Sequence, residues 1–131
     1  MLVNCTNHPY EVWSDLLKNA AEEQYGEVVS LPFPQVDPGW GVREIRREVE
    51  IYASRIEALH PDAVLAAGEF SFLFMLVDKL LEDGVKVICS CSVRNTVEVK
   101  NPDGSNEKKS VFLFERFRPY AYYHSEEETN G

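Results

Sequence analysis

The sequence predicts one doubly wound α/β domain, and two observations lead to that fold class. The first is a β-α-β unit within residues 62–95, in which an apolar strand (63–67) is followed by a helix through Leu81 and a second strand (85–92). Both strands are apolar runs rather than alternating patterns, which is typical of a parallel sheet covered on both faces. The second observation is that strands and helices alternate along the rest of the chain until a final hairpin.

The elements before this unit follow from capping residues and helical spacing. Residues 2–5 predict a first strand, and the polar residues before Pro9 predict the start of a helix that runs to Gln24. A short strand covers 28–31, followed by a loop whose prolines and glycines exclude regular structure. Residues 42–59 place apolar side chains at steps of three and four, which predicts a second helix.

A hairpin closes the predicted domain. Residues 96–100 and 110–117 show alternating apolar and polar side chains on either side of a Pro102-Asp103-Gly104 turn. The expected fold is therefore a three-layer sandwich with a parallel four-stranded core sheet and a C-terminal β-hairpin. Residues 1–120 would form this single domain, and residues 121–131, first aromatic and then acidic, would form a flexible tail.

Composition limits the partners and the compartment. A net charge of −9 argues against duplex DNA, because that binding requires many phosphates to be neutralised. The odd number of cysteines, all within predicted strands, favours a reducing, cytoplasmic location, and we expect neither a signal peptide nor a membrane helix. Cys89 and Cys91 lack a second ligand pair at zinc spacing, so no metal or other cofactor is expected. The helix through Leu81 is apolar on nearly all sides, which predicts contact with a second subunit.

Topology predicts where a ligand would bind. In a flavodoxin-like strand order, 2-1-3-4, ligands lie outside the carboxyl ends of the first and third strands. The helix N-termini there favour an anion, whereas the lack of a glycine-rich phosphate motif disfavours a simple mononucleotide or dinucleotide enzyme. The candidate ligand-binding residues in these loops and after the next strand are Thr6, Asn7, Gly68, Glu69, Phe70, Ser71 and Ser90.

Several short segments also resemble a known family. They are Val64 to Phe70, Ser92-Val93-Arg94, Pro102-Asp103-Gly104 and Phe112 to Tyr120. Together they resemble the small stand-alone CRISPR-associated proteins of the CARF-like ring-nuclease group. The resemblance implies a Rossmann-like homodimer that binds cyclic oligoadenylate, such as cyclic tetra-adenylate, across its two-fold axis and takes part in antiviral defence by switching off type III signalling.

The resemblance also implies metal-independent cleavage of the ring, in which a ribose 2′-hydroxyl attacks the adjacent phosphorus. Arg94 would then stabilise phosphoryl charge, because its planar guanidinium suits phosphate, and Ser92 would position the ring. His8 would transfer a proton, so these three are the candidate catalytic residues. Phe114 stands where the resemblance predicts a histidine, and that position therefore receives no catalytic role.

Other interpretations of these residues stay open. Glu69 and His8 are equally well explained as helix caps, and Arg94 could instead pair with Glu98. For Phe33 and Trp40, burial is the preferred interpretation over stacking on adenine. Two other functions are also compatible with the sequence. One is a sensor or sponge that binds the cyclic nucleotide without cleaving it, and the other is a nucleoside-modifying glycosidic hydrolase or transferase that uses Glu69.

Overall fold

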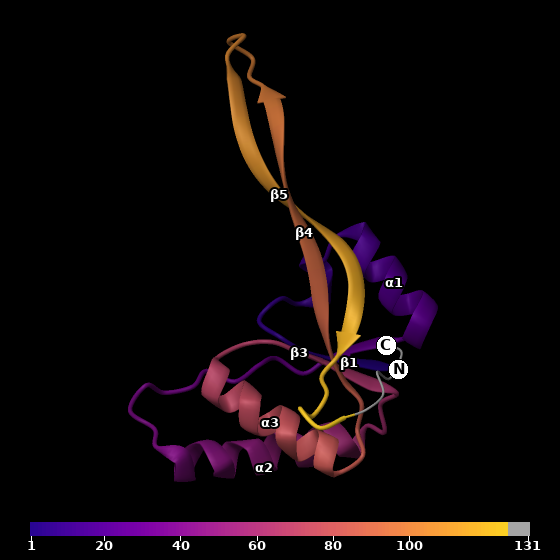
Figure 1. The fold of residues 1–131 in the computed structure, drawn as a ribbon, viewed down its shortest axis with the longest axis vertical. Coiled ribbons are helices and arrows are strands. Elements are labelled where there is room, and N and C mark those ends of the chain that lie inside the picture. The colour runs from indigo at the N-terminus through magenta and orange to yellow at the C-terminus, as the bar shows by residue number, and fades with distance from the viewer. Residues whose placement is uncertain (126–131) are drawn as a thin grey trace.

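The computed structural model describes residues 1–125 and is an α/β fold with one five-stranded mixed sheet (Figure 1). The elements are β1 (Leu2–Cys5), the 3₁₀ helix η1 (Tyr10–Val12), α1 (Asp15–Tyr25), β2 (Val28–Ser30), α2 (Val42–Ala58), β3 (Ala63–Ala66), α3 (Phe70–Glu82), β4 (Val87–Lys100) and β5 (Asn106–Pro119). The strand order is β2-β1-β3-β4-β5, and only the β4–β5 pair is antiparallel. The predicted α/β class is confirmed.

Helices cover both faces of the sheet. Helices α2 and α3 lie side by side on one face, where Val49 and Ile56 of α2 pack with Phe72 and Leu76 of α3 in the larger core cluster (Figure 1). Helix α1 lies on the other face, where Ala21 belongs to the second cluster. Strands β1 and β3 are buried along their whole length, as expected for strands covered on both faces.

The first predicted helix is wrong in its boundaries. The segment from Pro9 forms only the 3₁₀ turn η1, and α1 starts at Asp15 after an extended Trp13 and Ser14. The Ser14 hydroxyl accepts a hydrogen bond from the Leu17 amide at 3.3 Å, so Ser14 rather than the Thr6-Asn7-His8 group caps the helix.

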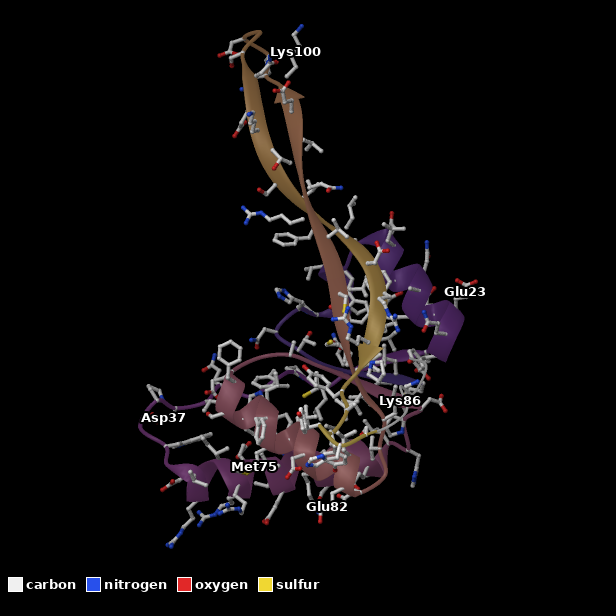
Figure 2. The ribbon with its side chains drawn as sticks, viewed as in Figure 1. Glu23, Asp37, Met75, Glu82, Lys86 and Lys100 are labelled. Carbon is white, nitrogen blue, oxygen red and sulfur yellow. The ribbon has the colours of Figure 1, made fainter. Side chains whose placement is uncertain are left out.

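The C-terminal strands also differ from the prediction. The predicted fourth strand and the first hairpin strand are a single strand, β4, so the sheet is mixed rather than a parallel four-stranded sheet with a separate hairpin. Strand β4 pairs with β3 through only Val87 and Ile88, and from there to Lys100 its register continues with β5. Residues 93–113, which we call the arm, project from the body of the domain (Figures 1 and 2).

The chain beyond β5 turns back onto α3. Tyr120 donates a hydrogen bond to the Ala66 carbonyl at 3.2 Å, and the Tyr122 hydroxyl lies 3.5 Å from the carbonyl oxygen of Asp78. The acidic part of the predicted tail, residues 126–131, lies outside the described residues. No helix within residues 1–125 combines the length and the apolar character needed to cross a bilayer.

Candidate functional site

A buried polar network fixes the loop after β1. Asn4 is only 1% exposed although it lies within an apolar strand. Its side-chain amide donates to the His8 carbonyl at 2.9 Å, and its side-chain oxygen accepts from the Thr6 hydroxyl at 2.7 Å. The Thr6 hydroxyl accepts in turn from the His8 amide at 3.1 Å, and the Trp13 indole donates to the His8 carbonyl at 2.9 Å. Because buried polar groups require partners, this network holds the loop in one conformation.

An open cavity of about 340 Å³ lies beside this loop, on the α1 face at the carboxyl edge of the sheet. Its polar lining comes from the loop, from the start of α1 and from β4. Its apolar lining includes two phenylalanines of β5, which lie opposite Arg94 and Ser92 in the strand register. The polar residues are Thr6, His8, Ser14, Ser90 and Ser92, and the aromatic ones are Trp13, Phe112 and Phe114.

Strand β4 presents hydroxyl groups to the cavity and thiols to the other face. Ser90 and Ser92 line the cavity, and Cys89 and Cys91 alternate with them, because successive side chains of a strand point to opposite faces. Both cysteines are partly buried, and burial raises the pKa of the Cys89 thiol. Within residues 1–125, no three histidine, cysteine or acidic side chains are grouped so that they could hold a metal ion.

Arg94 lies on the same face as Ser92, one step farther out along β4. Its guanidinium donates to the Ser110 hydroxyl across the hairpin at 3.1 and 3.3 Å, whereas it does not line the cavity. Its strand partner is Phe112, which does line the cavity. Arg94 is therefore placed at the outer margin of the site, where it holds the base of the arm.

The turn between β3 and α3 contributes none of its predicted ligand-binding residues to the cavity. The Glu69 carboxylate accepts hydrogen bonds from the Ser71 hydroxyl at 2.6 Å and from the Phe72 amide at 2.8 Å. The hydrogen bond from the Ser71 hydroxyl is the main cause that lowers the pKa of Glu69, and the bonds from the Phe72 and Ser71 amides lower it further. Glu69 is thus the N-cap of α3, and neither it nor Gly68, Phe70 or Ser71 lines the cavity.

Gly68 has a packing role in this turn. A Cβ atom at this position would lie 2.4 Å from the ring of Phe33, far inside ordinary contact distance. Phe33 is buried and packs edge-on against Phe72 with 5.1 Å between ring centroids, and Trp40 packs against the same core cluster. Burial therefore accounts for Phe33, whereas Trp40 is partly buried against the same core.

The structure therefore separates the predicted site residues, and Gly68, Glu69, Ser71 and Arg94 line none of the cavities that the others line. Thr6, His8, Ser90 and Ser92 line one cavity. Asn7 lines a neighbouring cavity of about 230 Å³ with Ser30 and Pro32, and Phe70 lines a separate groove along α3.

A protein-family model matches residues 1–118 and is described as the Uncharacterized protein MJ1673 family. This chain belongs to the MJ1673 family. The match extends from β1 to Arg118, the penultimate residue of β5, and therefore includes the cavity and the arm. No curated protein matches the chain.

Sequence reasoning missed Asn4, which fixes the loop beside the cavity, and two residues of this family member that line it, Ser14 and Phe112. The signal for Asn4 was its polar side chain within an apolar strand, because such a side chain must find buried hydrogen-bond partners. Ser14 was signalled by the Ser-Asp pair that starts α1. Phe112 could be found only once the register of β4 with β5 was known, because only the register places it opposite Arg94, next to the Ser92–Phe114 pair.

Proposed function

We propose that this protein binds cyclic oligoadenylate at the carboxyl edge of its sheet and cleaves it, as a CARF-like ring nuclease with a Rossmann-like fold. The supporting observation is the cavity in which the hydroxyl groups of Ser90 and Ser92 lie beside His8 and the exposed ring of Phe112. Hydroxyl groups can donate to phosphoryl oxygens, and an exposed aromatic ring can stack on adenine. The partial sequence resemblance supplies the identity of the ligand, and a symmetric ring suits two copies of the chain.

The proposed reaction needs no group beyond the chain and its ligand. The ribose 2′-oxygen forms a bond to the adjacent phosphorus while the bond from phosphorus to the 5′-oxygen breaks. The imidazole of His8 takes the proton of the 2′-hydroxyl and returns a proton to the departing 5′-oxygen, so the products are a 2′,3′-cyclic phosphate and a 5′-hydroxyl and His8 is neutral again. Ser90 and Ser92 hold the phosphate in line, and Arg94 stabilises phosphoryl charge from the margin of the site.

A second candidate is binding without cleavage. All the side chains that line the cavity, with the exception of His8, belong to types that carry no charge, and Arg94 is engaged with Ser110. A site of this kind can hold a nucleotide through stacking and hydrogen bonds but gives little stabilisation to the charge that develops during phosphoryl transfer. The protein would then sequester the ring.

Incubation with cyclic tetra-adenylate, followed by liquid chromatography and mass spectrometry, separates these functions. Ring opening to linear species with a 2′,3′-cyclic phosphate supports the nuclease, and an intact ring that co-purifies with the protein supports the sponge. Release of free adenine would support the glycosidic alternative, and no binding at all would contradict the proposal.

The variant His8→Ala tests the proton transfer. We expect it to slow ring opening by about 10²- to 10⁴-fold, the usual contribution of a general acid or base. The matched control is His60→Asn, because His60 lies away from the cavity and has φ 51°, a left-handed conformation that asparagine tolerates. Equal loss of rate in both variants would argue against a catalytic role for His8.

A further inference from the structure

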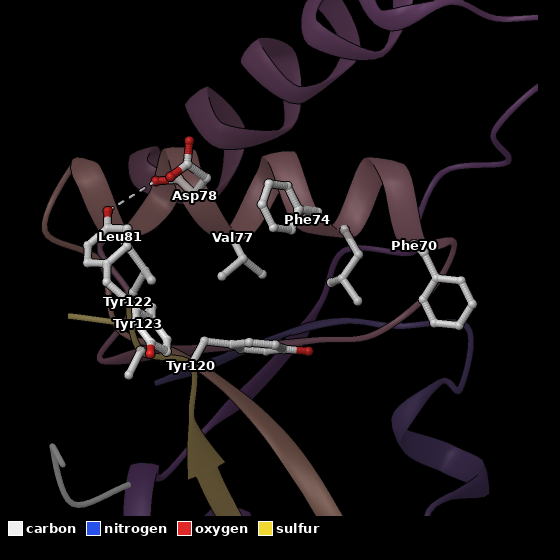
Figure 3. Close-up of a pocket in the computed structure, with 10 residues that line it drawn as sticks. Phe70, Phe74, Val77, Asp78, Leu81, Tyr120, Tyr122 and Tyr123 are labelled. Carbon is white, nitrogen blue, oxygen red and sulfur yellow. Dashed lines mark hydrogen bonds between the residues drawn. The ribbon is translucent and has the colours of Figure 1, made fainter. Parts of the chain in front are cut away.

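Helix α3 and the chain after β5 form a groove that no other segment of residues 1–125 covers. It is about 500 Å³ in volume and runs between α3 and residues 120–123 (Figure 3). Phe70 and Phe74 are 86% and 80% exposed on its rim, and Tyr123 is 95% exposed. Side chains this large and apolar are rarely left in water in such a contiguous patch unless the patch is a contact surface.

The arm has an apolar face of its own. The β4–β5 register places Val93 opposite Leu113 and Asn95 opposite Val111, with Val97 on the same face. Val93, Val97 and Leu113 are all exposed, whereas the opposite face bears Arg94, Thr96 and Glu98. An isolated two-stranded hairpin is marginally stable in water, so an arm with one aliphatic face gains from a surface that covers it.

The groove and the arm match in length and in charge. From Phe70 to Leu81 the helix rises about 17 Å at 1.5 Å per residue, and from Val93 to Val99 the strand extends about 20 Å at 3.3 Å per residue. The arm carries four basic and three acidic side chains in a chain of net charge −9. Lys109 lies opposite Val97 in the register and so places a basic side chain on the face that would meet Asp78 of the groove.

The area is sufficient for a stable dimer. The three exposed rings of the groove offer about 500 Å² if a full aromatic side chain offers about 200 Å². The aliphatic face of the arm brings each protomer near the ~800 Å² per partner of a standard interface. In a two-fold dimer each protomer gives one arm and receives one, which covers both surfaces at once.

We propose that this protein is a homodimer in which the arm of each protomer lies in the α3 groove of the other. The inference deepens the homodimer of the proposed function by naming its surface. Because Phe112 at the base of the arm lines the cavity, the exchange places each cavity next to the interface.

Sedimentation velocity over a range of concentrations tests the proposal with two charged variants. Val97→Lys lies on the aliphatic face of the arm, and Phe74→Lys lies on the rim of the groove. We expect a dimeric wild type, and a dimer dissociation constant at least about 30-fold higher in each variant, the effect of losing a central interface side chain. The matched controls are Thr96→Lys, on the opposite face of the arm, and Ile51→Lys, an exposed apolar residue of α2, and both should stay dimeric.

A mixing experiment tests the exchange itself. Val97→Lys retains its groove and Phe74→Lys retains its arm, so the mixture keeps one intact arm–groove contact. We expect the mixture to form more dimer than either variant alone. A monomeric wild type, variants that dimerise like the wild type, or a mixture that behaves as the average of its parts would each overturn the inference.

These measurements are made without nucleotide, so they test the dimer interface separately from the proposed function. A dimer of this kind that leaves cyclic tetra-adenylate untouched and unbound would retain the interface and reject the ligand. Ring opening by a protein whose Val97→Lys variant stays dimeric would retain the ligand and reject the interface.

Discussion

Replacing Gly68 by alanine should destabilise the protein, because the added methyl group would clash with the ring of Phe33. The new Cβ would lie 2.4 to 2.5 Å from three carbon atoms of Phe33. Ordinary carbon contacts start near about 3.5 Å, so the ring has to move by about 1 Å. Phe33 is 6% exposed and held against Phe72, which leaves it no free space to move into.

The magnitude follows from two limits. Overpacking of a filled core costs about 1 to 3 kcal/mol. Complete expulsion of the ring would expose about 200 Å² of apolar surface and cost about 5 kcal/mol at 25 cal/mol per Å². We therefore expect Gly68→Ala to lower the free energy of unfolding by about 2 to 3 kcal/mol, which urea denaturation with a slope of about 1 to 3 kcal/mol/M resolves readily.

A double-mutant cycle with Phe33→Leu tests the reasoning. The leucine removes the ring atoms that the alanine would meet, so Gly68→Ala should cost at least about 1 kcal/mol less in that background. Additivity within about 0.5 kcal/mol would refute the clash as the cause.

Three further predictions concern the cap, the thiols and the buried network. Glu69→Gln should lower the melting temperature at pH 7. Because the folded state lowers the pKa of Glu69, the difference in melting temperature between the wild type and the variant is fully present above the ordinary value of 4.5 and disappears as the pH falls through the lowered pKa. A difference that does not depend on pH would contradict the role of Glu69 as the cap. Burial raises the pKa of Cys5 to about 12, so a disulfide reagent at pH 8 should label it only after unfolding, and native-state labelling of Cys5 in a peptide map would contradict its burial. Asn4→Ala removes the oxygen that accepts from the Thr6 hydroxyl at 2.7 Å and the amide that donates to the His8 carbonyl, and should cost about 1 to 3 kcal/mol by urea denaturation. The exposed Asn7→Ala should change stability by less than about 0.5 kcal/mol.

The elements with strong local signals could be predicted from the sequence. Strand β1 and helix α2 start at the predicted residues because an apolar run and a three-four spacing are local properties. The start of α1 was missed because the sequence offers two capping signals, the polar residues before Pro9 and Ser14. The hydrogen bond from the Trp13 indole to the His8 carbonyl favours the later one. Local pattern cannot choose between two plausible caps when tertiary contacts decide.

The site was harder to predict than the fold. Polar residues at strand ends could be assigned to one edge of the sheet, and four of them do line one cavity. The sequence could not separate a helix cap from a ligand contact at Glu69, because the same carboxylate suits both roles and only its hydrogen bonds distinguish them. The continuity of β4 was also hidden, because Arg94 and Asn95 interrupt its apolar pattern while the pairing with β5 continues through them.

The continuity of β4 has a mechanical consequence. A single stretch of backbone carries Ser90 and Ser92 into the cavity and then leaves the body of the domain as one strand of the arm. It is anchored to the parallel part of the sheet through only Val87 and Ile88. We therefore expect a contact at the outer end of the arm to shift the segment of β4 that carries Ser90 and Ser92, and with it one side of the cavity.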